Sequence, residues 1–287
     1  ETIRFFQEYQ LNFQIILVND GSSDSSWEVI KRLANEDDRI TSVNFLKNYG
    51  QHTAVFCGIR HAIGDYIITM DDDMQNPPGE IIHLIEKIHQ GYDTVFAEFR
   101  EKRHNIIRKI GSRIVGYLNY KIFGKPKDIV LTNFRIFSNE VGKRVADYQT
   151  FYPYIPGLIL KFSSTVGNVE TDHREREVGS SNYTPLTILR LVARLLFNYS
   201  SFPLKFLSTI GFIIAFLSFL AGIYYIGKNF IQGVDVPGWT TIVVLLSFLN
   251  GFVIIMLGVM GEYLARMMNQ LSVSESYHIK EIVNERV

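Results

Sequence analysis

The chain has 287 residues, and its 29 Lys and Arg residues balance its 29 Asp and Glu residues. Hydrophobic residues make up 47% of it and charged residues 20%, which excludes a disordered or collagen-like chain and argues against a protein that coats nucleic acid. This length allows one or two domains, each able to bury a core. The single cysteine, Cys57, excludes a disulfide framework and a zinc site of paired cysteines, and we expect it to be a buried thiol.

Strand-like and helix-like segments alternate over residues 1–200. In chain order they are a strand at 13–18, a helix at 25–34, a strand at 40–45, a helix at 52–62, a strand at 66–70, a helix that begins at Pro77 and Pro78 and ends at Gly91, and a strand at 94–99. This order predicts an α/β fold with a mostly parallel, Rossmann-like sheet whose ligands gather at the carboxyl ends of the strands. No glycine-rich dinucleotide fingerprint and no P-loop motif occurs in the sequence, so dehydrogenases and P-loop ATPases are poorly supported.

Acidic residues follow two of the predicted strands. Asp20 follows the first strand, and Asp71, Asp72 and Asp73 follow the third. Like charges packed together are unfavourable unless a cation or hydrogen-bond donors compensate them. In an extended turn Asp71 and Asp73 point the same way, which suits a hard divalent ion that keeps water and phosphate oxygens as its other ligands. The alternative interpretation is helix capping beside a solvated acidic turn.

Residues 100–127 form a basic segment in an otherwise neutral chain. Nine Lys or Arg residues stand against one acid, Glu101, which gives this segment a charge of +8. Apolar residues recur at helical spacing within it, so an amphipathic helix is predicted over 104–124. Such a helix either packs on a core with its charged face in solvent or lies at an anionic lipid surface. The hydrophobic segments further along the chain favour the lipid surface.

Two runs without formal charge follow, the 22 residues 206–227 and the 26 residues 236–261. As helices they would be about 33 and 39 Å long, against about 30 Å for the hydrocarbon layer of a membrane. We therefore predict a transmembrane hairpin over 203–262, with spans at about 206–227 and 238–261, followed by a cytoplasmic tail at 263–287. Buried helices of a soluble protein are the alternative.

The basic residues around the hairpin predict its orientation. Arg190, Arg194 and Lys205 precede the first span and Arg266 follows the second, whereas the connector between the spans has only Lys228 and Asp235. Since basic residues stay on the cytoplasmic side, we expect a multi-pass protein of the inner (plasma) membrane with residues 1–200 in the cytoplasm. We also expect contact with membrane lipid, no nucleic-acid partner, and a hairpin that could support a homo-oligomer.

Six motifs resemble those of family 2 glycosyltransferases, and within that family those of the polyprenyl-phosphate glycosyltransferases. They lie at 19–24, 47–52, 64–65, 71–78, 133–135 and 173–183. The resemblance covers essentially the whole chain, including both spans. It implies a GT-A fold and an inverting, metal-dependent enzyme that moves one sugar from a UDP- or GDP-sugar to undecaprenyl or another polyprenyl phosphate for the cell envelope. It also implies that the first strand of the fold lies upstream of residue 1.

The resemblance assigns roles in donor binding. Asp20 matches the acid that holds the nucleoside of the nucleotide sugar. Asp71 and Asp73 match the residues that bind Mg²⁺ or Mn²⁺ across the diphosphate, with Gln75 beside the ion. Arg176 matches the arginine that neutralises the leaving diphosphate, so Asp73 and Arg176 are the predicted catalytic residues. A cation and an arginine placed there stabilise the charge that develops on the departing phosphate.

The resemblance also assigns residues to the acceptor. Arg108, Arg113 and Arg135 are candidates for the lipid phosphate, and Ser181 is a further predicted substrate-binding residue. A phosphate monoester with a second pKa near ~6 is largely ionised at neutral pH, so it needs positive charge more than a general base.

Two other functions fit parts of the pattern. A family 2 enzyme that elongates a polysaccharide should have more spans and a Gln/Arg-x-x-Arg-Trp segment, which this sequence lacks. A non-catalytic nucleotide-binding membrane scaffold would have no reason to keep Asp71, Asp73 and Arg176 together.

Overall fold

The computed structural model describes residues 1–99, 106–174, 185–232, 238–272 and 276–285. They form two compact units, one made of residues 1–189 and 273–287 and the other of residues 190–272. The predicted alternation of strands and helices is confirmed over residues 1–99, with boundaries that shift by a few residues.

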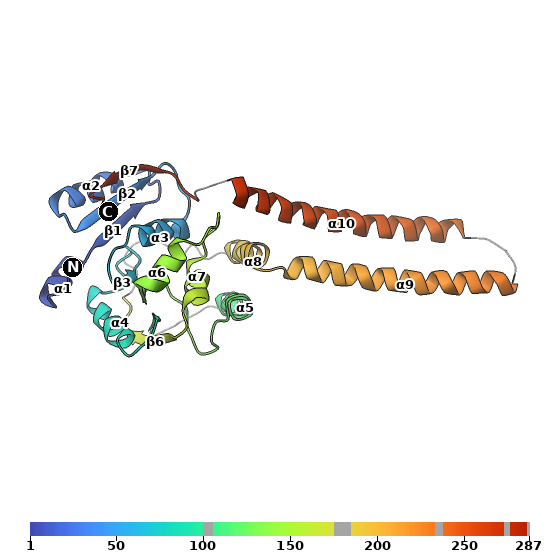
Figure 1. Ribbon diagram of the computed structural model, residues 1–287, viewed down its shortest axis with the longest axis horizontal. Coiled ribbons are helices and arrows are strands. Elements are labelled where there is room, and N and C mark those ends of the chain that lie inside the picture. Colours follow the sequence, from blue (N-terminus) through green and yellow to red (C-terminus); the bar gives the residue numbers. More distant parts are fainter. Residues whose placement is uncertain (100–105, 175–184, 233–237, 273–275, 286–287) are drawn as a thin grey trace. The chain divides into compact units, whose positions relative to one another are not determined.

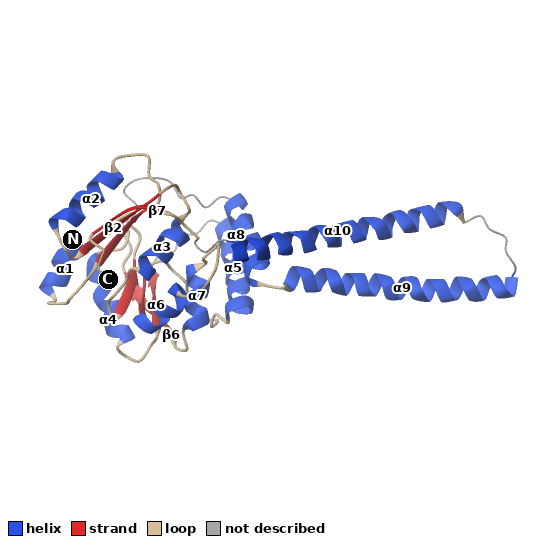
Figure 2. Cartoon of the chain, turned by 45° about the horizontal axis from the view of Figure 1, so that its top comes forward, coloured by secondary structure: helices blue, strands red, loops and turns tan. Residues whose placement is uncertain are grey.

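The first sheet of the larger unit combines strands from the N-terminal and the C-terminal parts of the chain (Figures 1 and 2). Its strands are β1 (Ile15–Asn19), β2 (Ile40–Phe45) and β7 (Ile279–Val283), in the order β1-β2-β7. β1 is parallel to β2, and β7 is antiparallel to it. Every residue of β2 is buried, as expected for the central strand of a covered sheet. The segment expected to be only a cytoplasmic tail, 263–287, thus supplies the end of a helix and a strand of this sheet.

The second sheet has four strands. They are β3 (Tyr66–Thr69), β4 (Thr94–Phe99), β5 (Arg135–Ser138) and β6 (Val166–Thr171), in the order β3-β5-β4-β6. β5 runs antiparallel to both of its neighbours, and only β6 and β4 are parallel. The prediction of a mostly parallel sheet is therefore wrong for the described residues, in which two of five strand pairings are parallel. The alternation of strands and helices that predicts parallel strands ends at residue 99. The antiparallel strands β5 and β7 come after that residue, outside the predicted pattern.

Helices cover these sheets. They are α1 (Thr2–Glu8), α2 (Ser26–Glu36), α3 (Gln51–Arg60), the 3₁₀ turn η1 (Pro78–Glu80), α4 (Ile81–Ile88), α5 (Ile106–Phe123), α6 (Asn139–Ala146) and α7 (Ile155–Phe162). α4 turns Ile81, Leu84 and Ile88 towards the core, where the spacing of three and four residues puts all three on one face. They pack with Val95 of β4 and Ile136 of β5. The core therefore lies against the sheet in which β5 pairs with β3, the strand that leads into the acidic turn.

α5 confirms the helix predicted over 104–124. Gly111 of this helix lies against Ile188, because a Cβ atom at position 111 would come within 2.6 Å of the Ile188 side chain. α5 also leaves Ile114, Tyr117 and Tyr120 exposed, at 45%, 60% and 42%. The helix thus has a packed side and an apolar side open to its surroundings.

The smaller unit is helical. α8 (Pro185–Tyr199) leads into it, and α9 (Phe202–Gln232) and α10 (Trp239–Ser272) lie side by side (Figures 1 and 2). The Tyr263 hydroxyl donates a hydrogen bond to the Ser200 carbonyl at 3.0 Å. Among the described residues, one stretch is long and apolar enough to cross a membrane, Phe248–Ala265, and none of it is buried. Phe202–Ile214 is a shorter apolar stretch, so the two predicted spans remain a prediction.

Candidate active site

The acidic turn after β3 opens into a pocket of about 220 Å³. Its lining comes from this turn, from the ends of β4 and β6, and from the segment before β5. The lining residues are Asp71, Asp73, Gln75, Asn76, Phe99, Thr132, Asn133, Phe134 and His173. The structure therefore brings together Asp71, Asp73 and Gln75, as the sequence predicts.

Side chains from two other segments fix Asp71. Gln51, at the start of α3, donates a hydrogen bond from Nε2 to Oδ1 of Asp71 at 2.7 Å. Asn133 donates from Nδ2 to Oδ2 of Asp71 at 3.2 Å. Burial raises the pKa of Asp71 above its ordinary value, the bond from Asn133 opposes this, and the charge of Asp73 raises it further. Bringing a divalent cation to this pair would favour the charged form of both carboxylates.

The donor set fits Mg²⁺ or Mn²⁺. In the part of the chain that the structure describes, no group of three or more His, Cys, Asp and Glu side chains is placed to hold a metal ion. Asp71 and Asp73 instead supply two carboxylates in an open pocket, and Mg²⁺ characteristically binds one or two carboxylates together with water and phosphate oxygens.

The segment that leads to Arg176 starts at this pocket. The backbone N–H of Arg174 donates to the Gln75 carbonyl at 2.9 Å, and the ring of His173 lies on that of Phe99 with centroids 4.1 Å apart. Burial lowers the pKa of His173, against the effect of the Asp73 charge. Two further predicted site residues, Arg176 and Ser181, lie outside the described residues.

Asp20 holds a loop beside the pocket. Its carboxylate accepts hydrogen bonds from the backbone N–H groups of Tyr49 and Gly50 at 2.6 and 2.8 Å. The next residue is Gln51, which binds Asp71. Gly21 has a φ of +68°, and a Cβ atom there would lie 2.6 Å from the backbone of the same loop, so only glycine fits this approach. Asp20 is therefore connected to the acidic pair through the loop, and its predicted contact with a nucleoside remains a prediction.

Arg135 is buried, contrary to the expectation that it faces a lipid phosphate. Its exposed fraction is 1%, and its Nε donates to the Thr69 hydroxyl at 3.0 Å. Thr69 in turn donates to the Asn133 carbonyl at 2.6 Å. Burial lowers the pKa of Arg135 to about 10, while the nearby charge of Asp71 raises it. The guanidinium thus lies behind the acidic pair, because β5 places residue 135 in the interior of the sheet.

The remaining acceptor candidates lie on α5. Arg113 is exposed, and Arg108 belongs to the helix, although its side chain lies outside the described part. The structure adds Gln51 and Asn133, to which the sequence assigns no role. Both lie within the motifs at 47–52 and 133–135, which is the signal that could have found them.

The comparisons with known proteins agree with this architecture. The model of the family "Glycosyl transferase family 2" matches residues 1–151. The chain is 31% identical over 285 residues to undecaprenyl-phosphate 4-deoxy-4-formamido-L-arabinose transferase of Proteus mirabilis (strain HI4320), an alignment that covers 98% of this chain and 87% of that protein. The protein of the same name from Yersinia pestis (strain Pestoides F) is 31% identical over 275 residues, which cover 94% of this chain and 84% of that one.

Among solved structures, glucosyl-3-phosphoglycerate synthase from Mycobacterium tuberculosis is similar over 66% of this chain and 69% of that one, with 16% identity and a TM-score of 0.46. The family match and the two transferases carry the identification. The chain belongs to glycosyl transferase family 2, and it is a glycosyltransferase, as its motifs predict.

Proposed function

We propose that this glycosyltransferase moves a single sugar from a nucleotide-diphosphate sugar to undecaprenyl phosphate or a related polyprenyl phosphate, with inversion at the sugar carbon. The observation that carries the proposal is the pairing of Asp71 and Asp73 in one open pocket. It is supported by the names of the two relatives, which are undecaprenyl-phosphate sugar transferases aligned along more than nine-tenths of this chain.

The residues in and near the pocket have different roles in binding the nucleotide sugar. Asp71 and Asp73 would hold Mg²⁺ or Mn²⁺, and the bound ion supplies positive charge to the departing nucleoside diphosphate. Gln51 donates to Oδ1 of Asp71 and Asn133 donates to both of its carboxylate oxygens, which holds this carboxylate in place. Arg176, which follows the segment anchored at Gln75, would stabilise the same developing charge.

The chain path supports an even number of membrane crossings. Residues 190–272 leave the larger unit, yet β7 pairs with β2 inside it. With a single crossing, β7 and β2 would lie on opposite sides of the membrane and could not pair. We therefore propose that α9 and α10 both cross, with the larger unit on the cytoplasmic side of the inner membrane.

The exposed side of α5 supports a lipid-facing role for this helix. Tyr117 and Tyr120 are exposed on it, and the charge of Lys121 lies over both rings, at 5.7 to 6.0 Å from their centroids. Aromatic rings and basic side chains together are typical of a helix at a membrane surface. Arg113 on the same helix would then meet the phosphate of the lipid acceptor.

The test is sugar transfer by membranes that contain the full chain. The membranes are incubated with undecaprenyl phosphate and a panel of radiolabelled UDP- and GDP-sugars, and we expect label from one donor to enter the organic phase. Asp71→Asn and Asp73→Asn should each lower transfer at least about 100-fold, because charge stabilisation at a leaving phosphate contributes several kcal/mol.

The matched control is Asp72→Asn, which removes a neighbouring exposed carboxylate that does not line the pocket. It should keep most of the activity. Full turnover of the Asp71 and Asp73 variants in the presence of EDTA would contradict the metal assignment. Label that enters a polymer in place of a lipid would contradict the acceptor.

A further inference from the structure

The C-terminal segment, residues 276–285, is built into the first sheet of the larger unit. Val283 lies opposite Ser42 in the antiparallel register, and Ile279 lies opposite Phe45. Without this strand, β2 would have one edge without a hydrogen-bonded neighbour. The segment thus completes a sheet whose other strands come from the first 45 residues.

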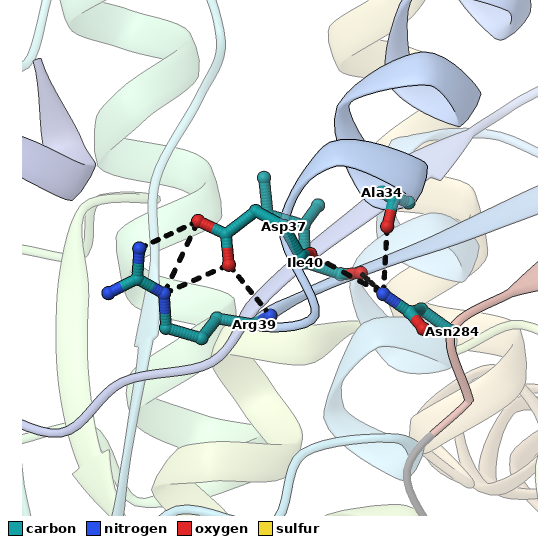
Figure 3. A network of polar contacts seen from close by, with 5 residues as sticks. All are labelled: Ala34, Asp37, Arg39, Ile40 and Asn284. Carbon is teal, nitrogen blue, oxygen red and sulfur yellow. Dashed lines mark hydrogen bonds and ion pairs between the residues drawn. The ribbon is translucent and has the colours of Figure 1, made fainter.

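Asn284 fastens the end of this segment to the turn between α2 and β2 (Figure 3). Its Nδ2 donates to the carbonyl oxygens of Ala34, Ile40 and Asp37 at 2.8, 3.3 and 3.4 Å. The carboxylate of Asp37 in the same turn accepts from the guanidinium of Arg39 at 2.7 Å. One side-chain amide therefore bonds carbonyl groups at the end of α2 and at the start of β2.

The beginning of the segment contacts the loop after β2. Tyr277 is 5% exposed, and its ring stacks on Phe45 with centroids 5.0 Å apart and planes at 25°. Phe45 meets the ring of Tyr49 edge-on at 5.6 Å. The His278 carbonyl accepts a hydrogen bond from the backbone N–H of Leu46 at 3.0 Å. Ring packing and a backbone bond thus hold the two ends of the 46–49 stretch.

The same loop supports the active site from its other side. The N–H groups of residues 49 and 50 bind the Asp20 carboxylate, and Gln51 binds Asp71. An unbroken series of contacts therefore runs from Tyr277 through Phe45 and the loop to Asp71 of the acidic pair. Leu46 itself is 62% exposed, so the contacts of Phe45 and of the Leu46 N–H group with the C-terminal segment, together with the Asp20 carboxylate, hold this loop.

We propose that the C-terminal segment is a positioning element for the nucleotide side of the active site, with Tyr277 as its main positioning residue. The segment sets the 46–51 loop so that Asp20 and Gln51 hold their places, and it touches no substrate itself. This inference rests on the proposed function, because it concerns binding of the nucleotide sugar. The residues after α10 would then be needed for binding of the nucleotide sugar, which is not expected of a C-terminal tail without contacts to the active-site loop.

The experiment uses the full chain in membranes and compares Tyr277→Ala with Tyr277→Phe. A 1 Å misplacement of a binding group can cost one to two orders of magnitude, so Tyr277→Ala should raise the KM for the nucleotide sugar about tenfold. The KM for undecaprenyl phosphate should stay within about twofold of its original value. Tyr277→Phe keeps the stacked ring and should restore donor binding. Lys280→Ala, at an exposed position of β7, is the matched control.

Hydrogen exchange of the same variants separates positioning from general unfolding. Peptides from residues 46–51 should exchange faster in Tyr277→Ala, and peptides from α4 should not change. Should α4 also exchange faster, Tyr277→Leu is measured in its place, since it keeps an apolar side chain and loses the stacked ring.

Two results would overturn the inference: a donor KM unchanged in the variant that keeps its fold, or unchanged exchange of residues 46–51. Failure of the proposed function has a different signature. In that case the unaltered chain transfers no sugar from any donor, while the exchange of residues 46–51 still reports whether Tyr277 positions the loop.

Discussion

The two units of this chain differ in how far they expose apolar side chains of the same types. In the larger unit Leu158, Ile159 and Phe137 are fully buried, whereas Ile254 and Leu257 of α10 are 68% and 60% exposed. In the larger unit, removing such side chains from water is the main favourable contribution to folding. Long helices with exposed apolar side chains instead suit a surrounding that is itself apolar. The difference shows that the fold of the larger unit buries its apolar side chains, whereas the described part of α10 leaves such side chains exposed.

The largest expected effect is the loss of stability when a buried apolar side chain of the larger unit is shortened. Leu158→Ala should lower the free energy of unfolding of the larger unit by about 2–5 kcal/mol, because it removes buried methyl groups and leaves a cavity. Leu257→Ala, the same change on α10, should shift it by less than about 0.5 kcal/mol. The free energy of unfolding of the larger unit is measured by denaturant titration. The fluorescence of Trp27 is followed in a Trp239→Phe background, so that the signal comes from this unit. Equal losses in the two variants would break the comparison.

A substitution by arginine in α10 tests whether its exposed apolar residues lie within lipid. Ile254→Arg should lower the fraction of chain that resists carbonate extraction from membranes, because an arginine at the centre of a spanning helix costs about 2.5–3.5 kcal/mol. Ile254→Leu keeps an apolar side chain and should behave like the unaltered chain. An arginine without effect on extraction would mean that this part of α10 does not lie within the lipid.

The smallest expected effect is the change in stability with pH that comes from the thiol of Cys57, which is buried in the larger unit. Burial raises the pKa of the Cys57 thiol to about 12, although Tyr277 and Arg60 nearby act in the opposite direction. Because the folded-state pKa lies above the ordinary value of 9.0, the thiol's contribution to stability is complete below pH 9 and is lost between pH 9 and about 12.

Iodoacetamide labelling measures this shift directly. At pH 8 the folded chain should react far more slowly than the chain in denaturant, since the thiolate is the reacting form. This is the chain's one cysteine, so any label reports on it alone. Equal rates in the folded and unfolded chains would place Cys57 at the surface and contradict its burial.

The acidic pair and its neighbour could be predicted because they depend on local sequence. Asp71, Asp73 and Gln75 lie within five residues in one turn after an apolar strand, and the structure keeps all three on the pocket. The amphipathic pattern over 104–124 likewise predicts α5, since helical periodicity is a property of neighbouring residues. The motifs also predicted the family, and the family match over residues 1–151 confirms it.

Other parts of the site depend on contacts between distant residues. Asn133 reaches Asp71 across 62 positions, and an arginine in a motif gives no sign that Arg135 will be buried at 1% exposure. The sequence shows the charge of a guanidinium, but β5 decides which way it faces.

The sequence by itself determined which carboxylates stand close together after a strand, where many of the helices form and which stretches are strongly apolar, because these follow from composition and from periods of two to four residues. Only the tertiary structure decided that residues 279–283 pair with residues 42–45 and that β5 runs antiparallel to its neighbours. Strand pairing is a choice among partners far apart in the chain. It is settled by which arrangement buries both faces and satisfies the backbone hydrogen bonds together.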